Sequence, residues 1–226
     1  TLTAWPEVMA QLQPGHRITV IRDGKTVETQ TYFEQRVGES FMRMRVDFDN
    51  PCENQRVRLH VRMKEHAERS FAEGQFAVAE RGQEVEDGHG EVPVPTYPAS
   101  AFVTAGGISL LFEHVTEYEL VGDEIAITIL RSTGLISRAD NPWREENAGP
   151  ELPIPACQMR GPWQFLLGVY PSDEVVHEQA ERYRHPFLTA PGTGPAGELG
   201  ARTGPALEGD RRVVLTALRR DDARIV

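Results

Sequence analysis

The 226-residue chain is acidic, because 34 Asp and Glu residues outnumber 24 Lys and Arg residues and give a formal net charge of -10. An acidic surface repels nucleic-acid phosphates and anionic lipid headgroups, so neither is an expected partner, whereas an uncharged sugar is compatible with this balance. No apolar run is long enough to span a membrane, and the first residues lack the basic start and apolar stretch of a signal peptide. The length allows one large β domain or one and a half ordinary ones.

Alternation of apolar and polar residues predicts antiparallel strands in the first part of the chain. Two such runs flank Asp23-Gly24, a dipeptide typical of two-residue hairpins. Residues 40–48 place Phe and Met side chains mostly on one face and Arg side chains on the other, and residues 55–63 repeat the pattern. Asn-Pro-Cys-Glu-Asn at 50–54 supplies the turn between them.

The same reasoning predicts further strands spaced at the short intervals of a β-sandwich. They are residues 70–80, 97–104, 107–113, 124–131, 163–170 and 213–219. One short helix is predicted at 173–184, where Ser172 is the N-cap and Pro186 follows the last turn. The expected fold is all-β, a large antiparallel β-sandwich with one accessory helix.

Two segments resist assignment to strands or helices. Residues 138–162 are rich in proline and charge and are predicted to form a long loop. Residues 190–210 are rich in Gly, Pro and Ala and are predicted to be a linker before the last strand. We expect a single sandwich domain over 1–226. We also expect that it was cut at both ends from a longer enzyme, because the chain lacks an initial Met and its last residues resemble the start of another strand.

The two cysteines, Cys52 and Cys157, lie far apart and have no CxxC companion, so the sequence predicts two free thiols. Free thiols are typical of reducing compartments, which favours a cytoplasmic location.

A GxGxxG spacing occurs at Gly192, Gly194 and Gly197. Pro191 precedes it, Pro195 lies inside it, and no strand-turn-helix pattern surrounds it, as a dinucleotide site would require. The glycines therefore indicate a linker.

The common catalytic and metal motifs are also missing. No serine lies in a GxSxG elbow, and His60, Glu65 and His66 lack the spacing of a zinc site. Paired carboxylates for glycoside chemistry are defined by their separation in space, so Glu117 and Glu119 are interpreted here as acids on a loop or strand.

An apolar strand at 124–131 leads charged and aromatic residues into the predicted loop. The array consists of Arg131, Arg138, Asp140, Trp143 and Arg144. Guanidinium and carboxylate groups bind sugar hydroxyls in pairs, and an indole ring packs against the apolar face of a pyranose. These five residues are therefore candidate substrate contacts. The alternative is that Arg131 and Arg138 pair with acids and order the loop.

Four segments together resemble the C-terminal half of bacterial family-38 glycoside hydrolases, which act on α-mannosides and related substrates. They are TYPASAFV at 96–103, LLFEHVTEYEL at 110–120, EIAITILRSTGLISR at 124–138 and QMRGPWQFLLGVYP at 158–171. The resemblance covers roughly residues 15–226. Eukaryotic members of the family differ at 113–120 and in the loop after residue 134, so the bacterial branch is closer.

The resemblance implies a sandwich like the galactose-mutarotase supersandwich, which follows a catalytic domain that this chain does not contain. In the family, a retaining mechanism uses an aspartate nucleophile, an acid/base carboxylate and a zinc-type metal from that N-terminal region. The resemblance therefore implies no catalytic residue and no metal ligand in this chain, which alone should be inactive. It makes Arg138 the first choice for a sugar contact, with Arg131 and Asp140 behind it.

Two other functions remain open. An autonomous carbohydrate-binding module would need a cluster of exposed aromatic side chains on one sheet face. A sugar epimerase or mutarotase on the same fold would need a histidine and a glutamate that converge, with His60 and His114 as candidates.

Overall fold

Strands form most of the regular structure in the computed structural model, which describes residues 17–22, 25–85, 88, 90–174, 176–185, 220–221 and 224–225. The larger sheet has eight strands in the order β1-β2-β3-β12-β9-β8-β5-β6. They are β1 (Arg17–Arg22), β2 (Lys25–Glu34), β3 (Met42–Asn50), β12 (Gly161–Tyr170), β9 (Ile108–Phe112), β8 (Phe102–Ala105), β5 (Ser70–Glu73) and β6 (Val78–Arg81).

A second sheet of four strands has the order β4-β11-β10-β7. They are β4 (Arg56–Arg62), β11 (Glu124–Arg131), β10 (Thr116–Val121) and β7 (Tyr97–Ala99). Neighbouring strands pair antiparallel in both sheets. The all-β, antiparallel prediction is confirmed.

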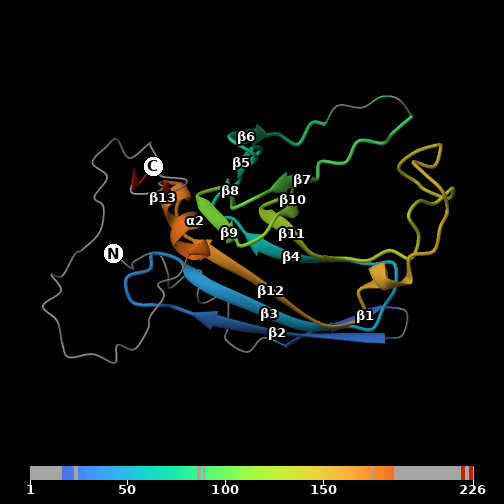
Figure 1. Cartoon of the computed structure of the whole chain (residues 1–226), viewed down its shortest axis with the longest axis horizontal. Helices are drawn as coiled ribbons and strands as arrows, with labels where there is room; N and C mark the ends of the chain where they lie inside the picture. Colours follow the sequence, from blue (N-terminus) through green and yellow to red (C-terminus); the bar gives the residue numbers. More distant parts are fainter. Residues whose placement is uncertain are drawn as a thin grey trace, which may run out of the picture. The chain divides into compact units, whose positions relative to one another are not determined.

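The core lies between the two sheets, which Figure 1 shows as two layers. β3 buries every second side chain, as its sequence alternation predicted, and its inward side chains pack with those of β12, β4 and β11. The buried cluster includes Met44, Val46, Val61, Ile127 and Leu167. Burial of these apolar side chains from both sheets is what holds the sandwich together.

One α-helix, α2 (Val176–Arg184), occurs among the described residues, within the range predicted for it. Ser172 Oγ accepts a 3.1 Å hydrogen bond from the Glu174 N–H in the turn before it. The helix packs on the outer face of β8 and β9, where Tyr183 and Val176 join a second apolar cluster with Leu111. None of the helices among these residues is both long and apolar enough to cross a membrane.

The strand boundaries differ from the sequence prediction in three places. The predicted strand 97–104 is two strands, because the chain leaves β7 of the small sheet and enters β8 of the large one at residues 100–101. The predicted strand 70–80 is a β5–β6 hairpin. β10 was not predicted as a strand. The predicted strand at 213–219, and the linker before it, lie outside the described residues.

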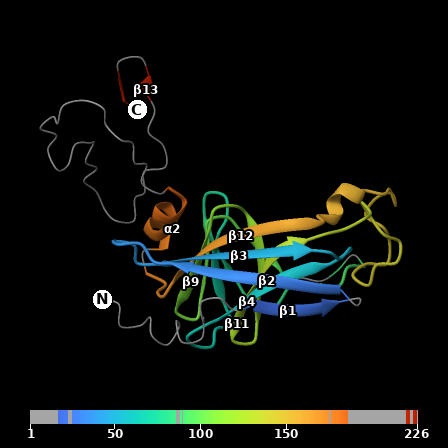
Figure 2. The ribbon, with the colours of Figure 1, turned by 90° about the horizontal axis from the view of Figure 1, so that it is seen from below.

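The turn between β3 and β4 crosses from one sheet to the other, rather than closing a hairpin. The 132–160 segment connects β11 to β12 and contains a 3-10 turn, η1 (Pro155–Gln158). Figures 1 and 2 agree in placing this segment and α2 at opposite ends of the sandwich.

Chain contacts divide the protein into two units, Thr1–Arg184 and His185–Val226. The first contains both sheets of the sandwich and α2. In the second, β13 (Arg220–Asp221) and β14 (Arg224–Ile225) form a two-stranded antiparallel pair.

Candidate functional site

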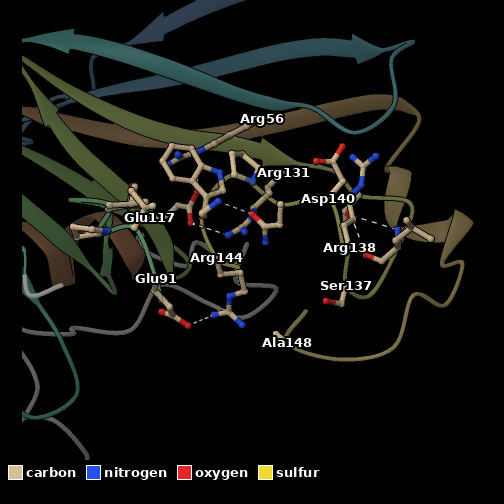
Figure 3. A pocket seen from close by; sticks show the side chains of 18 of the residues that line it. Arg56, Glu91, Glu117, Arg131, Ser137, Arg138, Asp140, Arg144 and Ala148 are labelled. Carbon is tan, nitrogen blue, oxygen red and sulfur yellow. Dashed lines mark hydrogen bonds and ion pairs between the residues drawn. The ribbon is translucent and has the colours of Figure 1, made fainter. Parts of the chain in front are cut away.

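A hollow of about 1110 Å³ opens at the end of the sandwich that carries the 132–160 segment. Its walls come from residues 85, 88 and 91–96 before β7 and from residues 133–148 after β11, and its floor from the ends of β4, β10 and β11. All five candidate residues from the sequence, Arg131, Arg138, Asp140, Trp143 and Arg144, line it. Figure 3 labels the three arginines and Asp140. Its volume lies just above the range of about 300–1,000 Å³ that is typical of small-molecule binding clefts.

The floor of the hollow is an ion-pair network around Glu117 on β10. Arg56 of β4 reaches across β11, and its Nε lies 2.9 Å from Glu117 Oε1 and donates to Thr128 Oγ1 at 2.8 Å. Thr128 in turn donates to Glu117 Oε1 at 2.8 Å. Arg131 Nη1 donates to the other oxygen, Glu117 Oε2, at 3.3 Å.

This network continues along the outer face of the small sheet. Arg58 forms an ion pair with Glu119 and likewise spans β11, on which Ala126, the residue opposite Glu119, is fully buried. The outward-facing acids of β10 are therefore partners of β4 arginines that lie two strands away.

Arg144 faces Glu91 across the mouth of the hollow, and the two form an ion pair (Figure 3). Two backbone hydrogen bonds support this contact: the Val92 N–H donates to the Trp143 carbonyl at 2.7 Å, and the Glu145 N–H donates to the Gly90 carbonyl at 3.3 Å. The two loops that form the walls are thereby joined at their tips.

Trp143 is 54% exposed and presents its side chain from a fixed stretch of backbone. The backbone N–H of Trp143 donates to Asn141 Oδ1 at 3.0 Å, and its backbone carbonyl accepts the hydrogen bond from the Val92 N–H. An exposed indole on an anchored backbone loses little conformational freedom when a ligand packs against it.

Arg138 and Asp140 are exposed and line the hollow, and neither has a hydrogen-bond or ion-pair partner within the described part of the chain. Arg131 pairs with Glu117, as the loop-ordering alternative expects, whereas Arg138 makes no such pair among the described residues.

The ends of the 132–160 segment are tied to the β3–β4 turn by a network of side-chain amides. Gln158 Oε1 accepts the Asn54 N–H at 2.7 Å, and Asn54 Oδ1 accepts the Gly134 N–H at 2.8 Å. Asn50 Nδ2 donates to the Gln158 and Met159 carbonyls at 3.1 and 2.9 Å. Because both ends are fixed, the residues between them hold their place over the hollow.

Sequence reasoning missed three residues that belong to this site: Arg56, Glu117 and Glu91. Arg56 and Glu117 follow the period-2 alternation that turns them away from the core, and this signal was present for β4. Nothing local in the sequence shows that Glu91, from a loop before β7, meets Arg144.

Other candidate groups lie elsewhere or are not assembled into a site. Among the described residues no three His, Cys, Asp or Glu side chains gather closely enough to hold a metal ion. His60 Nδ1 lies 2.8 Å from Glu124 Oε2 on the exposed face of the small sheet, and neither His60 nor His114 lines the hollow. Cys52 is buried, Cys157 is exposed, and neither is part of a disulfide, as predicted.

The chemistry of the hollow suits binding better than bond cleavage. Glycoside hydrolysis uses two carboxyl groups, one on each side of the scissile bond. Of the three carboxylates among the described residues that line the hollow, Glu117 accepts hydrogen bonds from Thr128 and Arg131 and forms an ion pair with Arg56. Glu91 is paired with Arg144, which leaves Asp140. The exposed guanidinium groups and the indole remain available to a ligand.

No protein-family model matches the chain, and no curated protein matches it. Among solved structures, an α-mannosidase from Enterococcus faecalis is similar, with a TM-score of 0.55 and 20% sequence identity over 73% of this chain. The match spans 18% of the length of that α-mannosidase. At this identity the likeness establishes the fold, which is shared with a part of a larger glycosidase.

Proposed function

We propose that this chain is the C-terminal sandwich domain of a retaining, α-mannosidase-type glycoside hydrolase related to family 38. In this proposal it supports a catalytic domain in the same polypeptide and adds sugar contacts from the hollow. The observation that carries the proposal is that five residues singled out as sugar contacts line one hollow on a fold shared with part of an α-mannosidase.

Each group in the hollow has a task in sugar binding. The guanidinium of Arg138 and the carboxylate of Asp140 are without protein partners in the described chain and can bind adjacent hydroxyls of a pyranose. The indole of Trp143 offers an apolar face to the ring. Arg131 and Arg144 are held from behind by Glu117 and Glu91, which fixes where their remaining donors point.

The divalent metal of the family, a zinc-type ion, would be bound by the catalytic domain, since the described residues of this chain do not form a ligand set for it. When bound there, it would act as a Lewis acid on the substrate. This chain's own residues would bind and orient the sugar and cover the catalytic site.

Binding is tested by titrating the chain with methyl α-mannoside and measuring the heat of binding. The expected result is binding that weakens about three- to tenfold in Trp143→Ala, in line with the loss of one aromatic contact. Trp163→Phe is the matched control, because Trp163 lies on β12 outside this hollow. Equal affinity of the wild type and Trp143→Ala for methyl α-mannoside would show that the indole does not contact the sugar.

Hydrolysis of p-nitrophenyl α-mannoside, measured with and without added zinc, tests whether the chain needs a catalytic domain for activity. We expect no hydrolysis by the chain alone and hydrolysis when it is mixed with the separately expressed catalytic domain. An autonomous binding module would bind sugar equally well but would leave the activity of the catalytic domain unchanged. Hydrolysis by the chain alone would contradict the proposal.

The contact of His60 with Glu124 is the one observation in favour of a mutarotase. A polarimetric assay of anomer exchange in free mannose tests it. Exchange above the rate in buffer that is lost in His60→Gln would favour that function over the glycosidase domain.

A further inference from the structure

The small sheet has an unpaired edge at β4. This strand is the first in the order β4-β11-β10-β7, and no strand of the described chain pairs with its other side. The Met63 N–H, directly after β4, donates to the Asp123 carbonyl at 2.8 Å on the β11 side. Backbone groups alternate from side to side along an antiparallel strand, so every second residue of β4 turns its N–H and carbonyl away from the sheet. These residues are Arg58, His60 and Arg62.

The core is incompletely closed along the same edge. Leu59 of β4 packs against the core cluster and is only half-buried, whereas Ile127, its pair on β11, is 0% exposed. Val57 is half-buried in the same way. The small sheet has four strands against eight in the large one. A further strand beside β4 would cover both of these apolar side chains.

The outward side chains of β4 determine what kind of strand fits beside it. All of them are basic: Arg56, Arg58, His60 and Arg62. Arg56 and Arg58 have acidic partners on β10, and His60 lies close to Glu124. Arg62 is exposed and forms no ion pair with the described residues. Like charges directly opposite one another destabilise a strand pair, so this edge disfavours a second copy of β4 and favours an acidic strand.

We propose that β4 binds a further antiparallel strand from a protein partner, an extended segment in which acidic and apolar residues alternate. Its acidic side chains lie opposite Arg58, His60 and Arg62, and its apolar side chains cover Val57 and Leu59. In strand addition of this kind, main-chain hydrogen bonds provide the affinity and alternate side chains the specificity. None of these five residues lines the hollow, so the surface is separate from the proposed sugar site.

The probe is a peptide of seven residues, as long as β4, in which Glu and Val alternate from a first Glu and both ends are blocked. Hydrogen exchange of individual backbone amides in the full chain is followed by NMR as the peptide is added. The amides of Arg58, His60 and Arg62 should exchange about tenfold more slowly at a peptide concentration about ten times the Kd. Those of Leu59 and Val61 should change less, because they already face β11.

N-methylation of the peptide backbone separates strand pairing from simple charge attraction. The Glu residues of the bound peptide exchange N–H···O bonds with β4, and the N–H groups of its Val residues point the other way. N-methyl groups on Glu should therefore weaken binding more than about tenfold, since several hydrogen bonds are lost together. The same groups on Val should change the affinity by less than about threefold.

Charge specificity is tested with Arg62→Glu and with a second peptide that has Lys in place of Glu. Arg62→Glu should weaken binding of the Glu peptide about fivefold, as the loss of one exposed ion pair and a new repulsion provide. The same variant should strengthen binding of the Lys peptide. Arg69→Glu is the matched control, since Arg69 is 71% exposed, lies outside β4, and undergoes the same change of charge.

Three results would overturn the proposal. In the first, exchange at Arg58, His60 and Arg62 stays the same over the whole titration. In the second, N-methylation of Glu leaves the affinity intact, or the Lys peptide binds the wild type as tightly as the Glu peptide. In the third, sedimentation shows that the chain alone is a dimer in which these amides are already protected, which would assign the edge to a second copy.

Discussion

Gly106 and Gly107 form the two-residue turn between β8 and β9 with φ angles of +54° and +75°. Both glycines adopt a left-handed backbone, but only Gly106 is also in close contact with its surroundings. A Cβ at Gly106 would clash with the Glu65 carbonyl oxygen, whereas a Cβ at Gly107 would meet nothing closer than 3.5 Å, on Lys64.

Gly107→Ala should therefore cost about 1–2 kcal/mol of unfolding free energy, the price of a left-handed alanine. Gly106→Ala should cost more than about 3 kcal/mol, because backbone must also shift. Urea denaturation of both variants measures the difference. Equal losses would show that the Gly106 Cβ is accommodated without moving residue 65.

Gln158, 7% exposed, connects the 132–160 segment to the β3–β4 turn through its contacts with Asn54. Gln158→Ala leaves the Asn54 N–H without an acceptor in a part-buried site, so we expect a loss of about 1–3 kcal/mol in urea denaturation. Gln164→Ala is the control, since exposed Gln164 makes one bond, to Asp47. A loss no larger than that of the control would mean that the segment is held by other contacts.

For individual residues, the sequence predicted which side chains point outward, but not which of them form ion pairs or hydrogen bonds with one another. Arg131, Arg138 and Trp143 follow a strand and a loop that are contiguous in the chain, so local patterning placed them together. The partners of Arg131 and Arg144 come from β10 and from the loop before β7, and only the fold brings them within bonding distance.

Among the elements, β10 shows why a strand can escape sequence analysis. Its residues alternate, with Tyr118 inward and Glu117 and Glu119 outward, but acids are uncommon in strands and suggest a loop. Here the arginines of β4 neutralise them. In contrast, β11 was predicted with its observed bounds, because a nearly unbroken apolar run that is rich in isoleucine indicates a strand without reference to distant residues.

The helix α2 offers a test of its packing through Tyr183, which is 2% exposed. Burial raises the pKa of the Tyr183 phenol. The folded state therefore holds this proton more tightly than the unfolded state, in which a tyrosine ionises near pH 10. Stability from this group is complete below that pH and is lost as pH rises above it, by up to about 1.4 kcal/mol per pH unit.

Urea denaturation at pH 9, 10 and 11 should show a falling free energy of unfolding, and a shallower fall in Tyr183→Phe. Part of the slope should persist in that variant, because burial also raises the pKa of Tyr118. An unchanged slope in Tyr183→Phe would mean that the phenol reaches water in the folded protein.

For the whole molecule, period-2 patterning predicted an antiparallel sandwich, and the structure confirms it. Strand order could not be predicted in the same way, since β3 pairs with β12 more than a hundred residues later. That pairing depends on which apolar faces fill the core together, which is a property of the assembled molecule rather than of any segment.

The division into two units makes a prediction about the chain as a whole. A variant that ends at His185 keeps both sheets and α2, and with them the hollow and the apolar clusters. Its free energy of unfolding should stay within about 1 kcal/mol of the full chain, which shifts the melting temperature by only about 2–4 °C. Its affinity for methyl α-mannoside should be unchanged. A larger loss of stability would show that residues 186–226 contribute to the sandwich, and a loss of sugar binding alone would place part of the site among them.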